Sequence, residues 1–181
     1  MAQNLIFSTL FFSIISLNDL ELPILAKNKV RLSKKGVTVI VSNEDAINKA
    51  FDKWETVKFL IANGLNTPKT FKDLGEAKKA LKLGELNYPV VVKPRWGSAS
   101  IAVDFAANAE ELDLDYSLQN KRVKTSILSE ASKEDSNHAI LIQEKISGIE
   151  FGMDVLNSLD GEYYASFARE KLSMRSGETD K

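Results

Sequence analysis

The sequence has no cysteine and only one histidine among its 181 residues. Without cysteine the chain cannot form disulfides, thiol nucleophiles, zinc fingers or iron–sulfur clusters, and a single histidine cannot build a histidine-based metal site. Any metal ion that the protein binds must therefore be a hard cation held by oxygen ligands.

An excess of one charge is also missing. The chain carries 24 Lys and Arg against 25 Asp and Glu, a net charge of −1, and neither sign forms a long block. Nucleic-acid binding depends on many phosphate contacts from a basic surface, so we expect no nucleic-acid partner. The hydrophobic share of 44% supplies enough apolar mass for one globular domain or two small ones.

Long hydrophobic runs are absent except for residues 5–17 (LIFSTLFFSIISL). This run is too short for a membrane-spanning helix, which needs about 20 residues. No Lys or Arg precedes it, and the polar residues Asn18, Asp19 and Glu21 follow where a signal peptide would have its cleavage site. Its composition favours a buried strand, with a targeting or anchoring segment as the alternative. We therefore predict a cytoplasmic protein with no membrane contact.

The first 41 residues read as strand, helix, strand. A helical pattern begins at Asp19 and stops at Gly36, and the β-branched run VTVIV follows at residues 37–41. This order is typical of a parallel α/β layer. Two strands and one helix cannot close a sheet, so residues 1–41 are expected to be part of a larger domain.

Three capping patterns predict helix starts: Ser42 with Asp45, Asp73 with Glu76, and Asn108 with Glu111. The first helix is expected to run to Asn63-Gly64 and the second to Gly84. Strands are predicted at residues 90–92, 101–105 and 139–143, and a hairpin at residues 151–157 and 162–168 around an Asp-Gly turn. Residues 121–137 fit a surface helix or a loop, and residues 169–181 form a polar tail.

The segment VVVKPRWGSAS at residues 90–100 carries the clearest chemical signal. Its three valines predict a buried strand, which would deliver the charge of Lys93 to the edge of a cleft. Gly97, Ser98 and Ser100 follow and could donate backbone and hydroxyl hydrogens to a phosphate. An ordinary hairpin with small turn residues is the alternative. The segment is not a P-loop, because it lacks Gly-Lys-Ser/Thr and a strand follows it.

Three ordered motifs resemble the ATP-grasp domain of the carbamoyl-phosphate-synthase-like group. They are VVVKPRWGSAS, the segment ILIQEKISGIEFGMDV at residues 140–155, and REKLSMRSGETDK at residues 169–181. The resemblance covers about residues 42–181, and residues 16–29 are similar to the end of the preceding pre-ATP-grasp domain. It implies an α/β fold: a partial pre-ATP-grasp unit at residues 1–41, then a two-lobed nucleotide-binding unit at residues 42–181.

The resemblance also implies a phosphate site. Lys53 and Lys93 match the two basic residues that the family uses for the nucleotide phosphates, and Gly97, Ser98 and Ser100 match its glycine-rich loop. Lys171 and Arg175 match catalytic groups that the family directs at the terminal phosphate, where positive charge stabilises the transferred phosphoryl group. Arg95 fits equally a surface charge on a loop, and His138 receives no role.

For the nucleoside, the resemblance implies four residues. Glu144 would face the adenine amino group, and Lys145 and Ile146 would offer backbone contacts. Glu150 would accept hydrogen bonds from the ribose hydroxyls, which suits a carboxylate with two oxygens. An exposed charge at a strand start is the alternative for Glu150.

The resemblance implies an ATP- and magnesium-dependent ligase that joins a carboxylate to an amine through an acyl phosphate. The family's magnesium ligands follow the GETDK-like segment, and the sequence ends at Lys181. We therefore expect a fragment truncated at its C-terminus, with no metal ligand of its own. A non-catalytic nucleotide-binding module is the alternative. Neither the carboxylate and amine substrates nor the oligomeric state can be inferred from the sequence.

Overall fold

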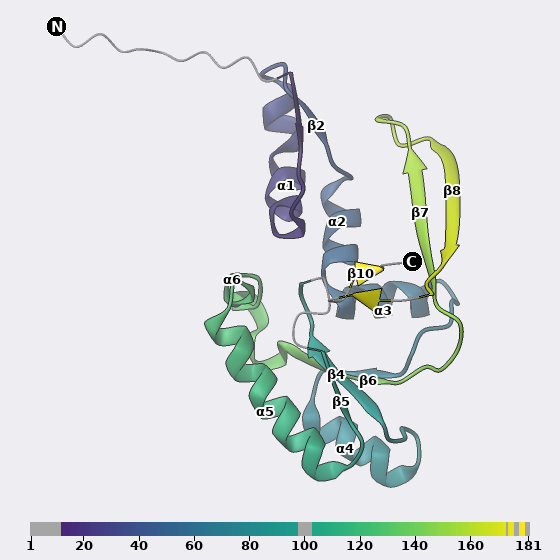
Figure 1. Ribbon diagram of the computed structural model, residues 1–181. Coiled ribbons are helices and arrows are strands. Elements are labelled where there is room, and N and C mark those ends of the chain that lie inside the picture. Colours follow the sequence, from purple (N-terminus) through teal and green to yellow (C-terminus); the bar gives the residue numbers. More distant parts are fainter. Residues whose placement is uncertain (1–11, 98–102, 173, 176–177, 180–181) are drawn as a thin grey trace, which may run out of the picture. The chain divides into compact units, whose positions relative to one another are not determined.

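The computed structural model describes residues 12–97, 103–172, 174–175 and 178–179 (Figure 1). The chain divides into two compact units, Met1–Ile47 and Asn48–Lys181. This boundary falls inside one helix, a few residues after the predicted one. The assignment of residues 1–41 to a pre-ATP-grasp domain stays a prediction.

The first unit follows the predicted order of strand, helix and strand. It contains β1 (Ser13–Ile15), a short 3₁₀ turn η1 (Asp19–Glu21), α1 (Leu22–Ser33) and β2 (Thr38–Ile40). The strands pair in parallel, with Ser13 opposite Thr38. After α1 the chain reverses at Gly36, whose φ of +78° favours glycine.

The apolar run at residues 5–17 was expected to form a buried strand. Residues 5–11 lie outside the described residues, and the described strand covers only Ser13–Ile15. Ile14 is half-buried there and Ile15 is 63% exposed. For the described part, the prediction of burial is therefore wrong, because β1 has only β2 as a neighbour. No helix in the described ranges has the length and apolar character needed to cross a membrane.

The second unit is built around a four-stranded sheet with the order β3-β6-β4-β5, in which all neighbours run antiparallel. Its strands are β3 (Thr70–Phe71), β4 (Val90–Pro94), β5 (Asp104–Ala106) and β6 (Ile140–Glu144). Three of them were predicted, whereas β3 has only two residues and was missed. The predicted strand at residues 101–105 begins outside the described residues.

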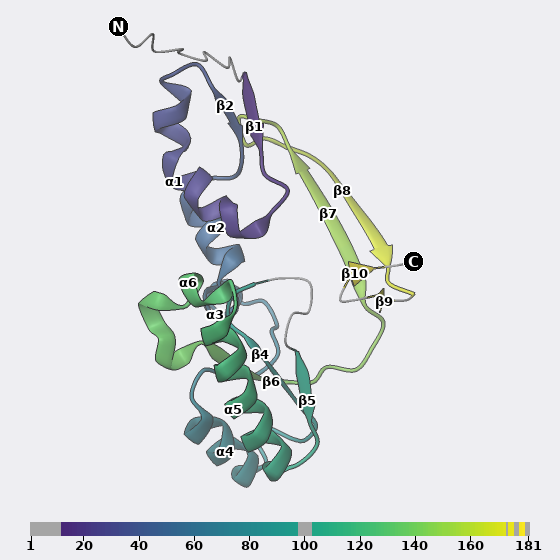
Figure 2. The same ribbon diagram turned by 60° about the vertical axis from the view of Figure 1, so that its left-hand side comes forward.

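Two helices pack against this sheet. They are α4 (Leu74–Leu83), which contacts β3, and α5 (Ala109–Thr125), which lies along β4, β5 and β6 (Figure 2). Both begin at the predicted caps: Asp73 accepts from the Glu76 N–H at 2.8 Å, and Asn108 from the Glu111 N–H at 3.0 Å. The core between sheet and helices contains Ala77, Ala80, Val90, Val92, Ala106, Leu112, Val123, Ile140 and Ile142.

Residues 42–63 form two helices where one was predicted: α2 (Glu44–Phe51) and α3 (Lys53–Ala62). Asp52 separates them in an extended conformation and caps α3. The cap of α2 also differs from the expected Ser42, because the side chain of Asn43 accepts from the Ala46 N–H at 2.8 Å. Residues 121–137 are helical in part, through the end of α5, α6 (Leu128–Ala131) and the 3₁₀ segment η2 (Lys133–His138).

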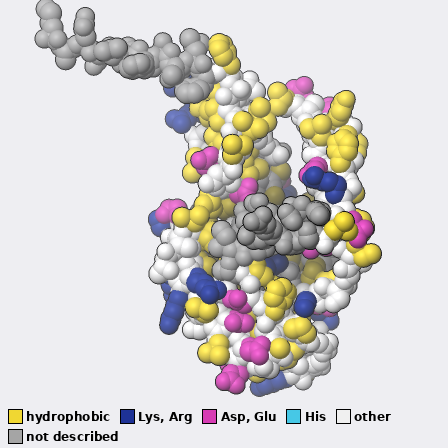
Figure 3. Space-filling view, in the orientation of Figure 1, with side chains coloured by type: hydrophobic (Ala, Val, Ile, Leu, Met, Phe, Trp, Pro, Cys, Tyr) yellow, Lys and Arg dark blue, Asp and Glu magenta, His cyan; other side chains and the backbone are white. Residues whose placement is uncertain are grey.

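The predicted hairpin is formed by β7 (Phe151–Asn157) and β8 (Tyr163–Glu170), with Gly161 in the turn at φ +89°. Its side chains are largely exposed, and Figure 3 shows apolar groups over it. In the hairpin, the large apolar residues that are at least half exposed are Phe151, Met153, Val155, Leu156, Leu159, Tyr163, Tyr164 and Phe167. The predicted polar tail contains two further short paired strands, β9 (Met174–Arg175) and β10 (Glu178–Thr179).

Candidate functional site

Successive side chains of β4 point to opposite faces of the sheet, one facing the core and the other the candidate site. Val90, Val92 and Pro94 are buried, whereas Val91 and Lys93 are half-buried and belong to the opposite face of the sheet. The register places Gln143 of β6 opposite Val91 on this second face. The Lys93 ammonium Nζ donates to Gln143 Oε1 at 2.6 Å. Gln143 in turn donates through Nε2 to Thr70 Oγ1 at 2.7 Å, so three strands hold Lys93 in place.

Lys53 reaches the end of the same strand from the first turn of α3. Its Nζ donates to the Gly97 carbonyl oxygen at 2.6 Å, and its backbone N–H donates to the Arg95 carbonyl oxygen at 3.1 Å. Helix α3 thus begins directly against the glycine-containing turn that follows β4. The structure brings together three of the predicted phosphate-binding residues: Lys53, Lys93 and Gly97.

The two lysines influence each other's charge. Burial lowers the pKa of Lys53 to about 8, the positive charge of Lys93 adds to this effect, and Asp52 opposes it. Burial also lowers the pKa of Lys93. Partial burial therefore disfavours the charged form of both ammonium groups. An anion bound between them would replace lost solvation and reverse the repulsion.

The turn at Gly97 requires glycine for two reasons. Its φ of +95° is a conformation that L side chains rarely adopt. A Cβ at this position would also lie 2.8 Å from Cδ2 of Leu128, a buried residue of α6. The Gly97 carbonyl that accepts from Lys53 is thereby fixed by both conformation and packing.

The predicted nucleoside residues begin with Glu144, the last residue of β6, and continue into the segment that follows it. Glu144, opposite Val90 in the register, accepts through Oε2 from the Lys69 N–H at 3.1 Å. Lys145 places Nζ 5.1 Å from the ring centroid of Phe105 in β5. Ile146 is 64% exposed in the following loop.

Glu150 and Lys171, predicted for ribose and phosphate, contact each other. Lys171 Nζ donates to Glu150 Oε1 at 2.6 Å, and the Lys171 N–H donates to the Glu150 carbonyl at 2.8 Å. This pair flanks the open end of the β7–β8 hairpin. Ser98 and Ser100 lie outside the described residues. Arg175 belongs to β9, and its side chain is likewise outside the described part.

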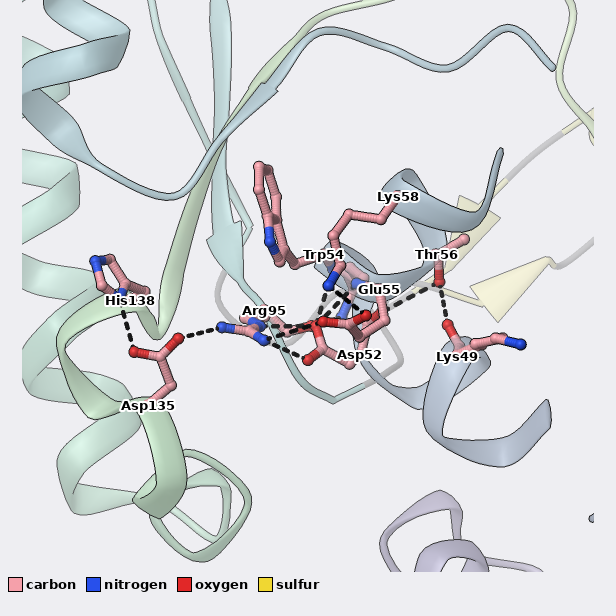
Figure 4. A network of polar contacts seen from close by, with 10 residues as sticks. Lys49, Asp52, Trp54, Glu55, Thr56, Lys58, Arg95, Asp135 and His138 are labelled. Atoms are coloured by element: carbon pink, nitrogen blue, oxygen red, sulfur yellow. Dashed lines mark hydrogen bonds and ion pairs between the residues drawn. The ribbon is translucent and has the colours of Figure 1, made fainter. Parts of the chain in front are cut away.

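Arg95 is not the surface charge that the sequence allowed. It is 7% exposed and donates from Nε and Nη2 to both carboxylate oxygens of Asp52, at 2.7 and 2.6 Å. Its Nη1 donates to Asp135 Oδ2 at 2.7 Å, and Asp135 also contacts Nδ1 of His138 at 2.6 Å (Figure 4). Burial works against the charged guanidinium, yet the hydrogen bonds and charges of the two carboxylates raise the pKa of Arg95.

Sequence reasoning missed two residues that shape the site, Asp52 and Gln143. Asp52 carried a readable signal, because an aspartate directly before an amphipathic stretch is a common helix cap. Gln143 could be found only through the strand register with Lys93. Among the described residues, no group of three or more acidic or histidine side chains is arranged to hold a metal ion.

Comparison with known proteins shows the family of the chain. A family model described as ATP-grasp domain matches residues 86–177, about half of the chain. The chain belongs to the ATP-grasp family. The matched segment contains Lys93, Gly97, Glu144 and Glu150, whereas Lys53 precedes it.

Two curated ATP-grasp relatives are similar over part of the chain. The large chain of carbamoyl phosphate synthase from Haemophilus ducreyi is 29% identical over 135 residues, which are 73% of this chain and 11% of that protein. Coenzyme gamma-F420-2:alpha-L-glutamate ligase from Methanococcus maripaludis is 37% identical over 70 residues, 38% of this chain and 25% of the ligase. The chain thus spans a quarter or less of both relatives.

Among solved structures, the biotin carboxylase domain of 2-oxoglutarate carboxylase from Hydrogenobacter thermophilus is similar, with a TM-score of 0.61 and 23% identity. The similarity covers 92% of this chain and 41% of that one, and that structure is a complex with MgADP, ADP and bicarbonate. At this identity the likeness concerns the fold: the chain has a mixed α/β ATP-grasp-like fold that corresponds to part of the larger proteins.

Proposed function

We propose that the chain binds ATP, with the phosphates between Lys53 of α3 and Lys93 of β4. The observation that supports this most is the pair of half-buried ammonium groups with lowered pKa values beside the Gly97 turn. An ordinary surface lysine loses no solvation, whereas these two are partly desolvated and donate to the neutral oxygens of Gly97 and Gln143, so a bound anion would add a charge interaction that they now lack. The triphosphate of a nucleotide fits this requirement.

Calorimetric titration of the full chain with ATP tests the phosphate site. Lys53→Met and Lys93→Met should each weaken binding at least tenfold, because a hydrogen bond to a charged group contributes about 1.5–3 kcal/mol. Lys79→Met, which removes an exposed lysine of α4, is the matched control and should bind as the wild type. Absence of wild-type binding, or equal affinity in all three variants, would reject the site.

For the nucleoside we propose Glu144 and the backbone of Lys145 and Ile146 at the adenine, and Glu150 at the ribose hydroxyls. Glu150 is held by Lys171 through a single exposed ion pair, which costs little to exchange for hydroxyl donors. The wild type should bind ADP more tightly than 2′,3′-dideoxy-ADP. Glu150→Ala should bind both nucleotides equally, and a preference that persists in this variant would exclude Glu150 from ribose recognition.

We further propose that the complete protein is a cytoplasmic, carbamoyl-phosphate-synthase-like ligase. In this reaction a substrate carboxylate oxygen attacks the γ-phosphorus of ATP, ADP leaves, and an acyl phosphate forms. An amine then attacks the acyl carbon, and phosphate leaves. Lys171 and Arg175 would stabilise charge at the transferred phosphoryl group. The magnesium ion that accompanies ADP in the 2-oxoglutarate carboxylase structure is expected here too, with no ligand assigned.

Turnover separates this ligase from the non-catalytic module. The full gene product is incubated with Mg-ATP, a panel of carboxylates and hydroxylamine, which traps acyl phosphates as hydroxamates. Carboxylate-dependent release of ADP with hydroxamate formation supports the ligase. ATP binding without ADP release supports a nucleotide-binding module.

A further inference from the structure

The buried Arg95 ties the end of β4 to the start of α3 by two kinds of contact. Its guanidinium holds both oxygens of Asp52, and its own carbonyl accepts from the N–H of Lys53, the next residue. Figure 4 shows the Asp52 carboxylate between Arg95 and the first turn of α3. Arg95 thus contacts two consecutive residues, Asp52 and Lys53, although 43 positions separate Arg95 from Asp52 in the sequence.

Asp52 connects the Arg95 side chain to the backbone of α3. Its Oδ1 accepts from the backbone N–H groups of Trp54 at 2.9 Å and Glu55 at 3.4 Å, so the carboxylate that Arg95 holds is also the cap of α3. Glu55 adds a more distant carboxylate, 3.9 Å from Nη2 of Arg95. The orientation of the first helical turn, where Lys53 lies, is therefore fixed relative to the end of β4.

Further contacts hold the Arg95 side chain in place. Nη1 donates to Asp135 of η2, and the guanidinium carbon lies 4.5 Å from the ring centroid of Trp96. Burial raises the pKa of Asp135, but its hydrogen bonds to His138 and Arg95 lower it overall, so the carboxylate stays charged. With three nitrogen atoms hydrogen-bonded and the Trp96 ring beside it, the guanidinium has little freedom to move.

A buried ion pair is weak evidence for a contribution to stability, because replacing it by well-packed apolar side chains is often neutral or stabilising. A role in fixing local geometry is the alternative. The group fixed here is the Lys53 ammonium, which ends 2.6 Å from the Gly97 carbonyl, two residues beyond Arg95. We propose that Arg95, through Asp52, is a positioning residue that holds Lys53 in place to receive the nucleotide phosphates.

This inference rests on the proposed ATP site, and a double-mutant cycle tests it. ATP affinity is measured for the wild type, Arg95→Met, Lys53→Met and the double variant. Arg95→Met should weaken binding at least tenfold when Lys53 is present and less than twofold in the Lys53→Met background. An equal loss in both backgrounds, or no loss, overturns the positioning role. Arg122→Met, which removes the exposed Arg122–Asp104 pair, is the control and should bind normally.

A second measurement needs no nucleotide and covers the case in which Arg95→Met fails to fold. Asn caps helices as well as Asp does, so Asp52→Asn keeps α3 but loses the ion pair. The pKa of Lys53 is then followed by NMR of its side chain. If Lys53 stayed in place, removing the charge of Asp52 would lower this pKa below about 8, because Asp52 now raises it. Release of Lys53 moves the pKa up towards 10.5 instead, which is the expected result. A fall rejects the positioning role even if ATP does not bind, and a rise supports it independently of the ATP site.

Discussion

At the scale of single residues, Lys53 is the group whose charge depends most on its surroundings. It carries a pKa of about 8 because burial and the charge of Lys93 outweigh the opposite effect of Asp52. Below that pH the ammonium is charged and suited to phosphate, and above it the neutral amine predominates. A lysine with an ordinary pKa near 10.5 would not titrate in this range.

The pH dependence of ATP binding follows from this pKa. A bound triphosphate raises the pKa of Lys53 above about 8. Near and above this pH, ATP binding is therefore accompanied by uptake of a proton, and the affinity for ATP falls as the pH rises. Between pH 7 and pH 9 we expect about a tenfold loss attributable to Lys53. Calorimetry in buffers of different ionisation enthalpy measures this uptake directly. In Lys53→Met the uptake should shrink to whatever Lys93 contributes, and an unchanged uptake would contradict the role of Lys53.

At the scale of secondary-structure elements, the Gly97 turn follows β4 and contacts the start of α3. The Gly97 carbonyl accepts a hydrogen bond from Lys53, and the turn packs against Leu128. Gly84, at the end of α4, is a suitable comparison. Gly84 has a similar positive φ of +71°, but nothing lies within 4 Å of a Cβ added there. The two glycines therefore differ in packing and share the same backbone requirement.

Gly97→Ala should cost more stability than Gly84→Ala. Both pay about 1 kcal/mol for the left-handed conformation. At Gly97 the clash with Leu128 adds about 1–3 kcal/mol, as in other overpacked cores. Urea denaturation of the two variants measures the difference. Equal free energies of unfolding would mean that α6 gives way at no cost and that the turn is not fixed by packing.

The elements that the sequence predicted are those whose signals are local. The caps at Asp73 and Asn108 use a partner three residues away, so their patterns were readable. The break between α2 and α3 was missed although the Asp52 cap is a local signal, whereas the contact of Asp52 with Arg95, far away in the sequence, was not readable. The burial of Arg95 has the same cause, since a charge in a turn looks exposed until its partners are known.

At the scale of the whole molecule, the order of three motifs was enough to predict the family, because three ordered motifs at suitable separations are more specific than any one of them. Their side-chain contacts were not predictable in the same way. The Glu150–Lys171 pair exists because β7 and β8 form a hairpin, which places residues 21 positions apart side by side. The chain spans a quarter or less of its curated relatives, and no substrate was predicted from its sequence.

Ligand binding should stabilise the folded chain by mass action. At an ATP concentration 100 times the dissociation constant, the gain is about 2.7 kcal/mol, which corresponds to a rise of about 5–10 °C in the melting temperature. Differential scanning calorimetry with and without ATP measures this rise. The Lys53→Met and Lys93→Met variants should show a smaller rise at the same concentration. A rise of the same size in these variants would indicate binding elsewhere.

The central claim, that nucleotide phosphates lie between Lys53 and Lys93, is tested most directly by a crystal structure with a non-hydrolysable ATP analogue. The account predicts phosphate oxygens within about 3 Å of both ammonium groups, a hydrogen-bonding distance for charged partners. Arg95 should keep both contacts to Asp52 and should not touch the nucleotide. Phosphates bound away from the two lysines, or an Arg95 guanidinium that leaves Asp52 to bind them, would contradict the account.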